Sequence, residues 1–282
     1  MKSYVSLFLA VVSLTAFAQI KTPSPSPSGS VSTTVGLTDV KIDYSRPRAK
    51  GRKIFGEGAN FLVSYGSIWR TGANNGTFIS FSDDVTVEGN KIAAGKYLIY
   101  TWPGASEWTV SLYKDLDLGG NITKYDASKE AAKFKVKPEK LAEKIETLTF
   151  NIGDISDDSK TAKVQLMWEN TSVKFTIGVD FDSKVMESIA KATGSGGGAY
   201  YQAASYYFDN GKDLKQALDW ATIASLTNKD AFWVWLLKAK IQKALGDKKG
   251  AMESSMTSKA AAEKASNAEY VKMNEELQKT LK

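Results

Sequence analysis

The sequence predicts an α+β protein of two domains, in which an antiparallel β-sandwich or barrel-like domain is followed by an array of α-helical hairpins. Three observations support this prediction. Between residues 31 and 180, short segments of alternating apolar and polar residues are separated by turn residues, with no helical segment among them. From Phe181 onward, apolar residues recur at helical spacing. Within this second part, two helical hairpins repeat with an offset of 34 to 35 residues.

The composition limits the chemistry available to the chain. Its 282 residues contain neither Cys nor His, which excludes a Cys nucleophile, a Ser-His triad, a His-ligated zinc or haem and a disulfide. The formal net charge of +6 is modest for this length, and the lysines are spread along both halves. We therefore expect no nucleic-acid partner, no metal and no other cofactor.

The first 18 residues have the pattern of a cleaved signal peptide. Lys2 precedes the apolar run 5–16, and residues 16–18, Ala-Phe-Ala, form a small-x-small cleavage site. The alternative, an N-terminal membrane anchor, needs an apolar run of about 20 residues, which is longer than this one. We expect cleavage after Ala18 and a mature protein in the periplasm or outside the cell, with no membrane span.

A linker and a first pair of strand signals follow. Residues 19–30 alternate Pro and Ser over much of their length, so they are expected to form an extended linker to a β domain at residues 31–180. Val40, Ile42 and Tyr44 alternate with polar residues, as in a strand with one buried face.

Residues 44–81 are the most unusual stretch of the chain. They contain four arginines, Trp69, Asn74 and Asn75, together with six glycines that permit tight turns. We expect a set of shaped loops here rather than regular secondary structure.

Strand signals then continue to residue 180. Gly89-Asn90 suits the turn of a tight hairpin, and turn residues such as Pro138 and Glu169-Asn170 separate the later strands. The strands are expected at residues 77–82, 85–88, 96–102, 108–113, 132–136, 145–152, 163–169 and 173–180.

Five segments in fixed order resemble the family known as domain of unknown function 2911. They are SVSTTVGLTDVKIDYSRPRAKGRKIFG, VSYGSIWRTGANNGTFISFSDDVTVEGNKIAAGKYLIYTWPG, EWTVSLYKD, VKPEKLAEKIETLTF and VQLMWENTSVKFTIGV. The likeness covers residues 28–180 and implies a β-sandwich-like domain of secreted proteins from Bacteroidetes-type bacteria, without an established activity. The chain differs from the family's pattern by an insertion at residues 57–61 and by Asn75, where an acidic residue is usual.

Residues 181–198 are expected to connect the two domains. A helix with apolar positions at Val185, Met186 and Ile189 ends near Gly194, and a glycine-rich hinge follows. The glycine run lacks the Lys-Ser/Thr of a phosphate-binding loop.

Residues 199–282 are expected to form a tetratricopeptide-like array. The hairpins 200–226 and 231–262 turn at Gly211 and Gly246, and residues 268–281 form a closing helix. Two repeats are fewer than the roughly three that independent stability usually requires, so the array is expected to be stabilised by contact with the β domain or with a partner.

The arginines of residues 44–81 suggest a ligand site. Guanidinium groups bind carboxylates, phosphates and sulfated sugars bidentately, and a nearby tryptophan can stack on a sugar ring. The ligand-binding candidates are Arg46, Arg52, Trp69, Arg70, Asn74, Asn75 and Trp102. In the alternative interpretation, the arginines fix loops by bonding backbone carbonyls and Asp43, Asp83 and Asp84, and the tryptophans belong to the core.

Two further features have a predicted role. Aromatic residues crowd the helical part, and we take Tyr200, Tyr207 and Trp233 as candidates for contacting a protein or peptide partner. Residues 114–121, with Asp126, partly resemble a calcium loop, but they lack its terminal Glu and its spacing and are interpreted as an ordinary polar turn.

The sequence leaves three functions open. The first is a non-enzymatic envelope protein, whose helical part docks an envelope protein or peptide while the β domain supports it or binds a glycan or anionic group. The second is a carboxylate-dependent hydrolase of envelope polysaccharide, which would need two facing acids in a cleft, one with a raised pKa. In the third, the β domain is purely structural.

Overall fold

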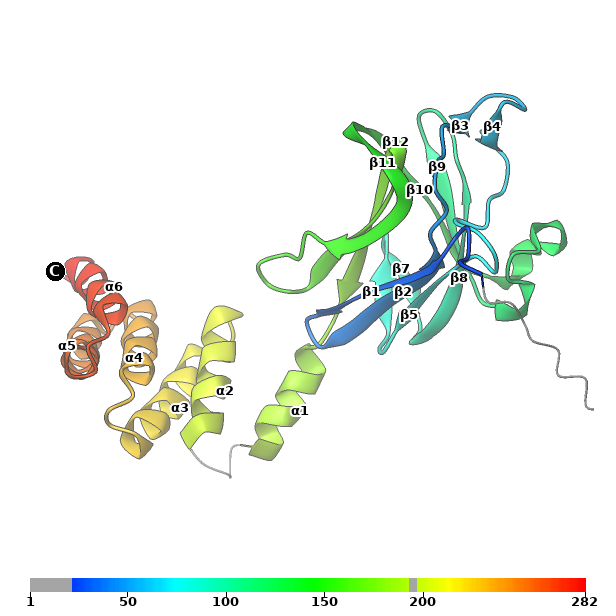
Figure 1. Cartoon of the computed structure of the whole chain (residues 1–282). Coiled ribbons are helices and arrows are strands. Elements are labelled where there is room, and N and C mark those ends of the chain that lie inside the picture. Colours follow the sequence, from blue (N-terminus) through cyan, green and yellow to red (C-terminus); the bar gives the residue numbers. More distant parts are fainter. Residues whose placement is uncertain (1–21, 193–196) are drawn as a thin grey trace, which may run out of the picture.

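In the residues that the structure describes, an N-terminal region of mainly antiparallel β-sheets is followed by six α-helices, as predicted (Figure 1). Three short 3-10 helices at residues 116–129 lie between the strands, where no helical segment was expected. The computed structural model describes residues 22–192 and 197–282, so the expected signal peptide lies outside the described residues. Gly197 and Gly198, expected in the hinge, instead begin α2 (Gly197–Asp209), and the rest of the hinge lies outside the described residues. Strands begin at Ser28, three residues before the expected start of the β domain, because β1 (Ser28–Val35) pairs along its whole length with β2 (Thr38–Ser45).

The larger sheet has six strands in the order β1-β2-β5-β8-β9-β10. Its other members are β5 (Thr77–Phe81), β8 (Gly95–Trp102), β9 (Trp108–Tyr113) and β10 (Glu130–Val136). In β2 every second residue is buried, which gives the sheet one face that packs inward.

The smaller sheet has four strands in the order β11-β12-β6-β7. They are β11 (Pro138–Gly153), β12 (Thr161–Val179), β6 (Val85–Val87) and β7 (Asn90–Ile92). The two ends of β12 meet, since the Val179 amide donates to the Lys160 carbonyl at 2.8 Å. The strand therefore folds back on itself at Glu169, whose φ of 54° is left-handed, in agreement with the predicted turn.

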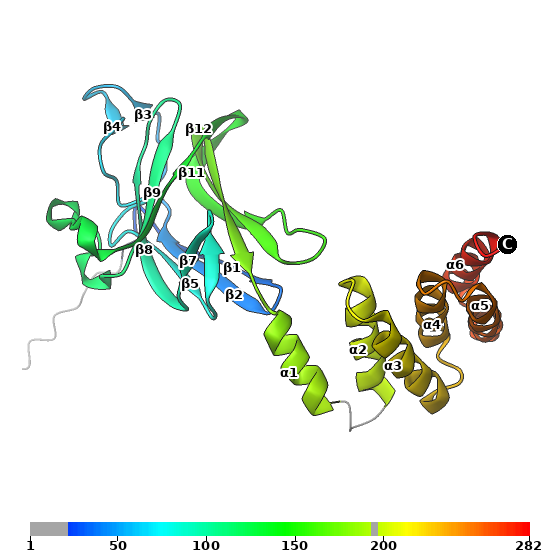
Figure 2. The same cartoon turned by 180° about the vertical axis from the view of Figure 1, so that it is seen from behind.

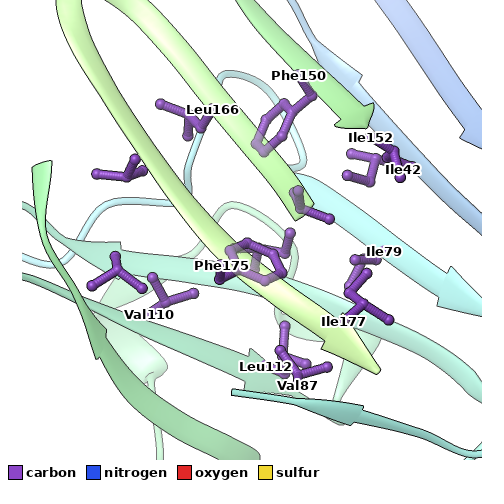
Figure 3. Close-up of a cluster of buried hydrophobic side chains, with 14 of the residues drawn as sticks. Ile42, Ile79, Val87, Val110, Leu112, Phe150, Ile152, Leu166, Phe175 and Ile177 are labelled. Atoms are coloured by element: carbon purple, nitrogen blue, oxygen red, sulfur yellow. The ribbon is translucent and has the colours of Figure 1, made fainter. Parts of the chain in front are cut away.

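The main core lies between the two sheets. Figure 3 shows Ile42 beside Ile152 and Ile79 beside Ile177, so each pair joins one sheet to the other. All four side chains are at most 6% exposed. The inward-facing positions of both sheets thus form one hydrophobic layer, as expected for a β-sandwich.

The prediction of irregular loops at residues 44–81 was partly wrong. Two short strands, β3 (Lys53–Gly56) and β4 (Phe61–Ser64), pair in parallel at one end of the sandwich (Figure 1). They form because Phe55 and Val63 are buried in the main core and need a fixed backbone to reach it. Pro138, expected in a turn, instead begins β11. Proline has no backbone N–H to donate, and the first residue of a strand tolerates this.

The helices follow in a row that leads away from the sandwich (Figure 2). They are α1 (Asp182–Ala192), α2 (Gly197–Asp209), α3 (Leu214–Thr227), α4 (Phe232–Ala244), α5 (Lys248–Lys264) and α6 (Ala268–Lys279). Helices α2 and α3 turn at Gly211, and α4 and α5 turn at Gly246, both with positive φ. The hairpins agree with the predicted ones, and their identity as tetratricopeptide repeats stays a prediction.

Candidate functional site

Three cations of the β region, Arg48, Lys50 and Arg52, line one groove, which we call the basic groove. Pro25 and Ser26 complete its wall, and its volume is about 300 Å³. The three cations alternate along a bend in which Lys50 and Gly51 both have positive φ, 49° and 73°. Their side chains therefore gather on one short stretch of chain.

Long-range contacts fix the backbone of the basic groove. Arg48 forms an isolated bridge with Thr147 of β11, and the Ala49 amide donates to the Glu146 carbonyl at 2.7 Å. The Lys50 amide donates to Oε1 of Glu146 at 2.7 Å, so one carboxylate lies at the rim. The groove thus lies on a turn that backbone hydrogen bonds anchor to β11.

The charged atoms of the groove have few partners. Arg52 donates from Nε to the Ala49 carbonyl (3.0 Å) and from Nη2 to the Arg48 carbonyl (2.6 Å). The guanidinium of Arg48 and the ammonium of Lys50 form no hydrogen bond or ion pair within residues 22–192 and 197–282. Two of the three cations are therefore free to bind an anion.

Three of the other candidate polar residues, Arg46, Arg70 and Asn74, make hydrogen bonds within the chain. Arg46 donates to the Leu148 carbonyl (3.4 Å) and to Thr149 Oγ1 (3.2 Å), and Arg70 donates to the Asn74 carbonyl (3.1 Å). Asn74 Nδ2 donates to Ser45 Oγ at 3.0 Å. Asn75 is exposed.

The expected acidic partners of the arginines are occupied elsewhere. Across the described part of the chain, every ion pair uses a lysine. Asp43 pairs with Lys41 at 2.9 Å, and Asp83 pairs with Lys184, whose hydrogen bond lowers the pKa of that carboxyl. Asp84 accepts the amide of Ala94 at 2.8 Å. Arg46, Arg52 and Arg70 thus donate to carbonyl and hydroxyl oxygens, and within the described residues no arginine forms an ion pair.

The two candidate tryptophans do not join the basic groove. Trp69 is 7% exposed and stacks on Trp168 with ring centroids 5.9 Å apart, so it belongs to the core and cannot stack on a ligand. Trp102 is half-buried on the other face of the larger sheet, where Lys133 Nζ lies 4.4 Å from its ring centroid. Sequence reasoning selected Arg52 of the groove but missed Arg48 and Lys50, although their i, i+2, i+4 spacing with Arg52 was a usable signal.

Acidic side chains of the described residues form ion pairs with lysines and accept backbone amides, and the hydrolase alternative stays a prediction. In residues 22–192 and 197–282, no group of three or more Asp or Glu side chains is placed to hold a metal ion. Asp115 of the supposed calcium loop instead pairs with Lys129 at 2.5 Å and caps Asp117, and the Lys129 hydrogen bond lowers its pKa. The carboxyl pKa values that are shifted are all shifted downward.

The three candidate partner residues of the helical part lie in different surroundings. Tyr207 packs edge-on against Trp220 with ring centroids 4.7 Å apart, while Trp233 is 37% exposed beside Phe232. Tyr200 borders a hollow of about 670 Å³ that is also lined by Trp220 and Ile223. Tyr200 and Tyr207 thus both lie beside Trp220, while Trp233 is exposed next to Phe232.

Comparison with known proteins identifies a family and nothing more specific. Residues 26–177, more than half of the chain, match the family described as "Protein of unknown function (DUF2911)". No curated protein matches the chain. Among the helices that the structure describes, none has the length and apolar character needed to cross a membrane.

Proposed function

We propose a function for this chain, which belongs to the DUF2911 family: it is an exported, non-enzymatic binding protein of the cell envelope. Its β domain takes an anionic group, on a glycan or as a small anion, in the basic groove. Its helical part docks an envelope protein or peptide. The signal-peptide pattern of the first 18 residues supports export to the periplasm or beyond.

The anion proposal rests on one observation. Within the described residues, the charged groups of Arg48 and Lys50 have no partner, and they lie beside the guanidinium of Arg52, which two hydrogen bonds hold in place. Three cations in a groove of about 300 Å³ create a positive potential that Glu146 partly offsets. Sulfate, phosphate and carboxylate groups match guanidinium geometry, and charge-assisted hydrogen bonds are roughly twice as strong as neutral ones. A small anion or an acidic sugar chain is therefore the ligand that best matches the charge and the hydrogen-bond donors of the groove.

Titration calorimetry with dextran sulfate, and with uncharged dextran of the same length, tests this proposal. We expect heat from dextran sulfate alone and a weaker affinity as salt rises, because salt screens exposed charges. Equal affinity for both polymers, or no binding to either, would contradict an anion site.

The exposed apolar side chains of α3 support docking by the helical part. Ile223 is 40% and Leu226 is 66% exposed, and repeat-like helical hairpins commonly present such surfaces to partners. A pull-down from envelope extract, comparing residues 19–282 with a truncation after Gly194, tests this part. A partner held only by the longer chain is expected, whereas a partner held equally by both would move the docking site to the β domain.

A further inference from the structure

A second hollow lies at the end of the sandwich where β3 and β4 pack, and we call it the end pocket. Its lining includes Phe55, Tyr65, Trp108, Glu139 and Asn170. Its volume is about 320 Å³, at the lower limit for small-molecule sites. Four separate chain segments converge there, and none of the residues belongs to the basic groove.

The floor of the end pocket is aromatic and rigid. Phe55 and Trp108 pack edge to face with ring centroids 4.8 Å apart, and Trp69 and Trp168 pack against Phe55 from within the core. Phe55 is 7% and Trp108 is 1% exposed, so both rings belong to the packed core and form a closed floor that cannot collapse into the hollow. Tyr65, which is half-buried, adds a ring at the wall.

The rim of the end pocket is polar, and its polar atoms are not used by the fold. Within the described residues, none of the side chains of Glu139, Lys140, Asn170 and Thr171 forms a hydrogen bond or ion pair, and neither does the Tyr65 hydroxyl. By contrast, every fully buried side-chain nitrogen or oxygen in the described chain has a partner. The rim thus offers a carboxylate acceptor, an ammonium donor, an amide that can do both, and two hydroxyls.

The backbone holds this rim in a fixed geometry. Glu139 pairs with Ser172 and Lys140 pairs with Thr171 in the ladder between β11 and β12, so the rim lies on strands. Opposite them, Gly104 belongs to a turn in which an added Cβ would overlap the Glu107 carbonyl oxygen. A site built on such elements keeps its polar groups in place before a ligand arrives.

We infer that the end pocket is a saccharide-binding site that accepts one pyranose ring. A sugar has an apolar C–H face, which suits the half-buried ring of Tyr65, and hydroxyls around its edge, which suit a rim of mixed donors and acceptors. A purely apolar ligand would leave those rim groups without partners. A simple anion would gain little, because Glu139 opposes Lys140.

Saturation-transfer NMR on the full chain tests the inference. The probes are D-glucose, D-galactose, D-mannose, N-acetyl-D-glucosamine and D-glucuronate, and titration of tryptophan fluorescence gives the Kd. The rim variant Glu139→Ala/Asn170→Ala is compared with Glu143→Ala/Asn151→Ala, which removes the same two residue types from exposed positions of the same strand, β11. Tyr65→Phe, which removes only a hydroxyl, replaces the rim variant if that variant does not fold.

We expect wild type and the Glu143→Ala/Asn151→Ala control to bind at least one of the five sugars with equal Kd. The rim variant should raise that Kd by about tenfold or more, the effect of losing hydrogen bonds to a polar ligand. Absence of saturation transfer from all five sugars, or equal Kd in rim and control variants, would overturn the inference. Loss of sugar binding in Arg48→Gln/Lys50→Gln would also overturn it, because the sugar would then occupy the basic groove.

Discussion

The Tyr206 hydroxyl donates a hydrogen bond to the carboxylate of Asp182, which ties α2 to the first residue of α1. Lys212 Nζ lies 3.0 Å from the same carboxylate, and Lys160 of the β region lies 3.7 Å from it. Asp182 is thus the point at which the helical part and the sandwich share one charge network. The Tyr206 hydrogen bond, followed by that of Lys212, holds the pKa of Asp182 below its ordinary value.

Asp182→Asn should loosen the contact between α1 and α2. The substitution removes the charge that Lys160 and Lys212 face, so we expect faster amide exchange in both helices and a lower Tm at pH 7. A folded-state pKa below the unfolded one adds stability that is fully present above the unfolded pKa of about 3.9. That stability is lost as pH falls further, so the Tm difference between wild type and variant should shrink below about pH 4. A difference that stays constant down to pH 3 would show that Asp182 acts without its charge.

Gly36→Ala should destabilise the chain more than Gly51→Ala. Both glycines have positive φ, 57° and 73°, so each substitution incurs the left-handed backbone cost of about 1–2 kcal/mol. At Gly36 an added Cβ would also overlap the ring of Phe181, whereas at Gly51 nothing lies within 4 Å. We expect an extra loss of about 1–3 kcal/mol at Gly36, measured by urea unfolding. Equal losses would mean that Phe181 moves aside freely.

Tyr100→Phe should release the segment that covers the outer face of the larger sheet. Tyr100 is fully buried, and its hydroxyl donates to the Gly119 carbonyl at 2.6 Å, while burial raises its pKa. Removal of the hydroxyl leaves that carbonyl without a donor, and we expect a loss of about 1–2 kcal/mol with faster amide exchange in residues 114–129. Tyr65→Phe is the matched control, since its hydroxyl has no partner in the described residues. A similar loss in both variants would contradict the account.

Much of the fold follows from local periodicity. The alternation of Val40, Ile42 and Tyr44 predicts β2, and these three residues are buried in the main core. The turns at Gly211 and Gly246 are equally readable, because a helical hairpin needs a residue that tolerates positive φ. Such signals depend on a few neighbouring residues, so one sequence suffices to find them.

The candidate site was harder to predict because it depends on distant pairing. Trp69 and Arg70 are adjacent in sequence, yet Trp69 faces the core while Arg70 reaches the Asn74 carbonyl. Successive residues of an extended chain point to opposite sides, so the two were unlikely to share a ligand. The backbone of the basic groove is held by the bridge between Arg48 and Thr147. The residues near Arg48 in the sequence do not predict this long-range contact.

The basic groove is tested most directly by the affinity of the full chain for dextran sulfate when two of its cations are neutralised. Arg48→Gln/Lys50→Gln removes two charges without removing a side-chain hydrogen bond seen in the structure. Lys124→Gln/Lys163→Gln removes two exposed lysine charges elsewhere in the β region. We predict that the first variant raises the Kd about tenfold or more, while the second leaves it within about twofold of wild type. Equal Kd values for the two variants, with both folded, would contradict an anion site at Arg48, Lys50 and Arg52.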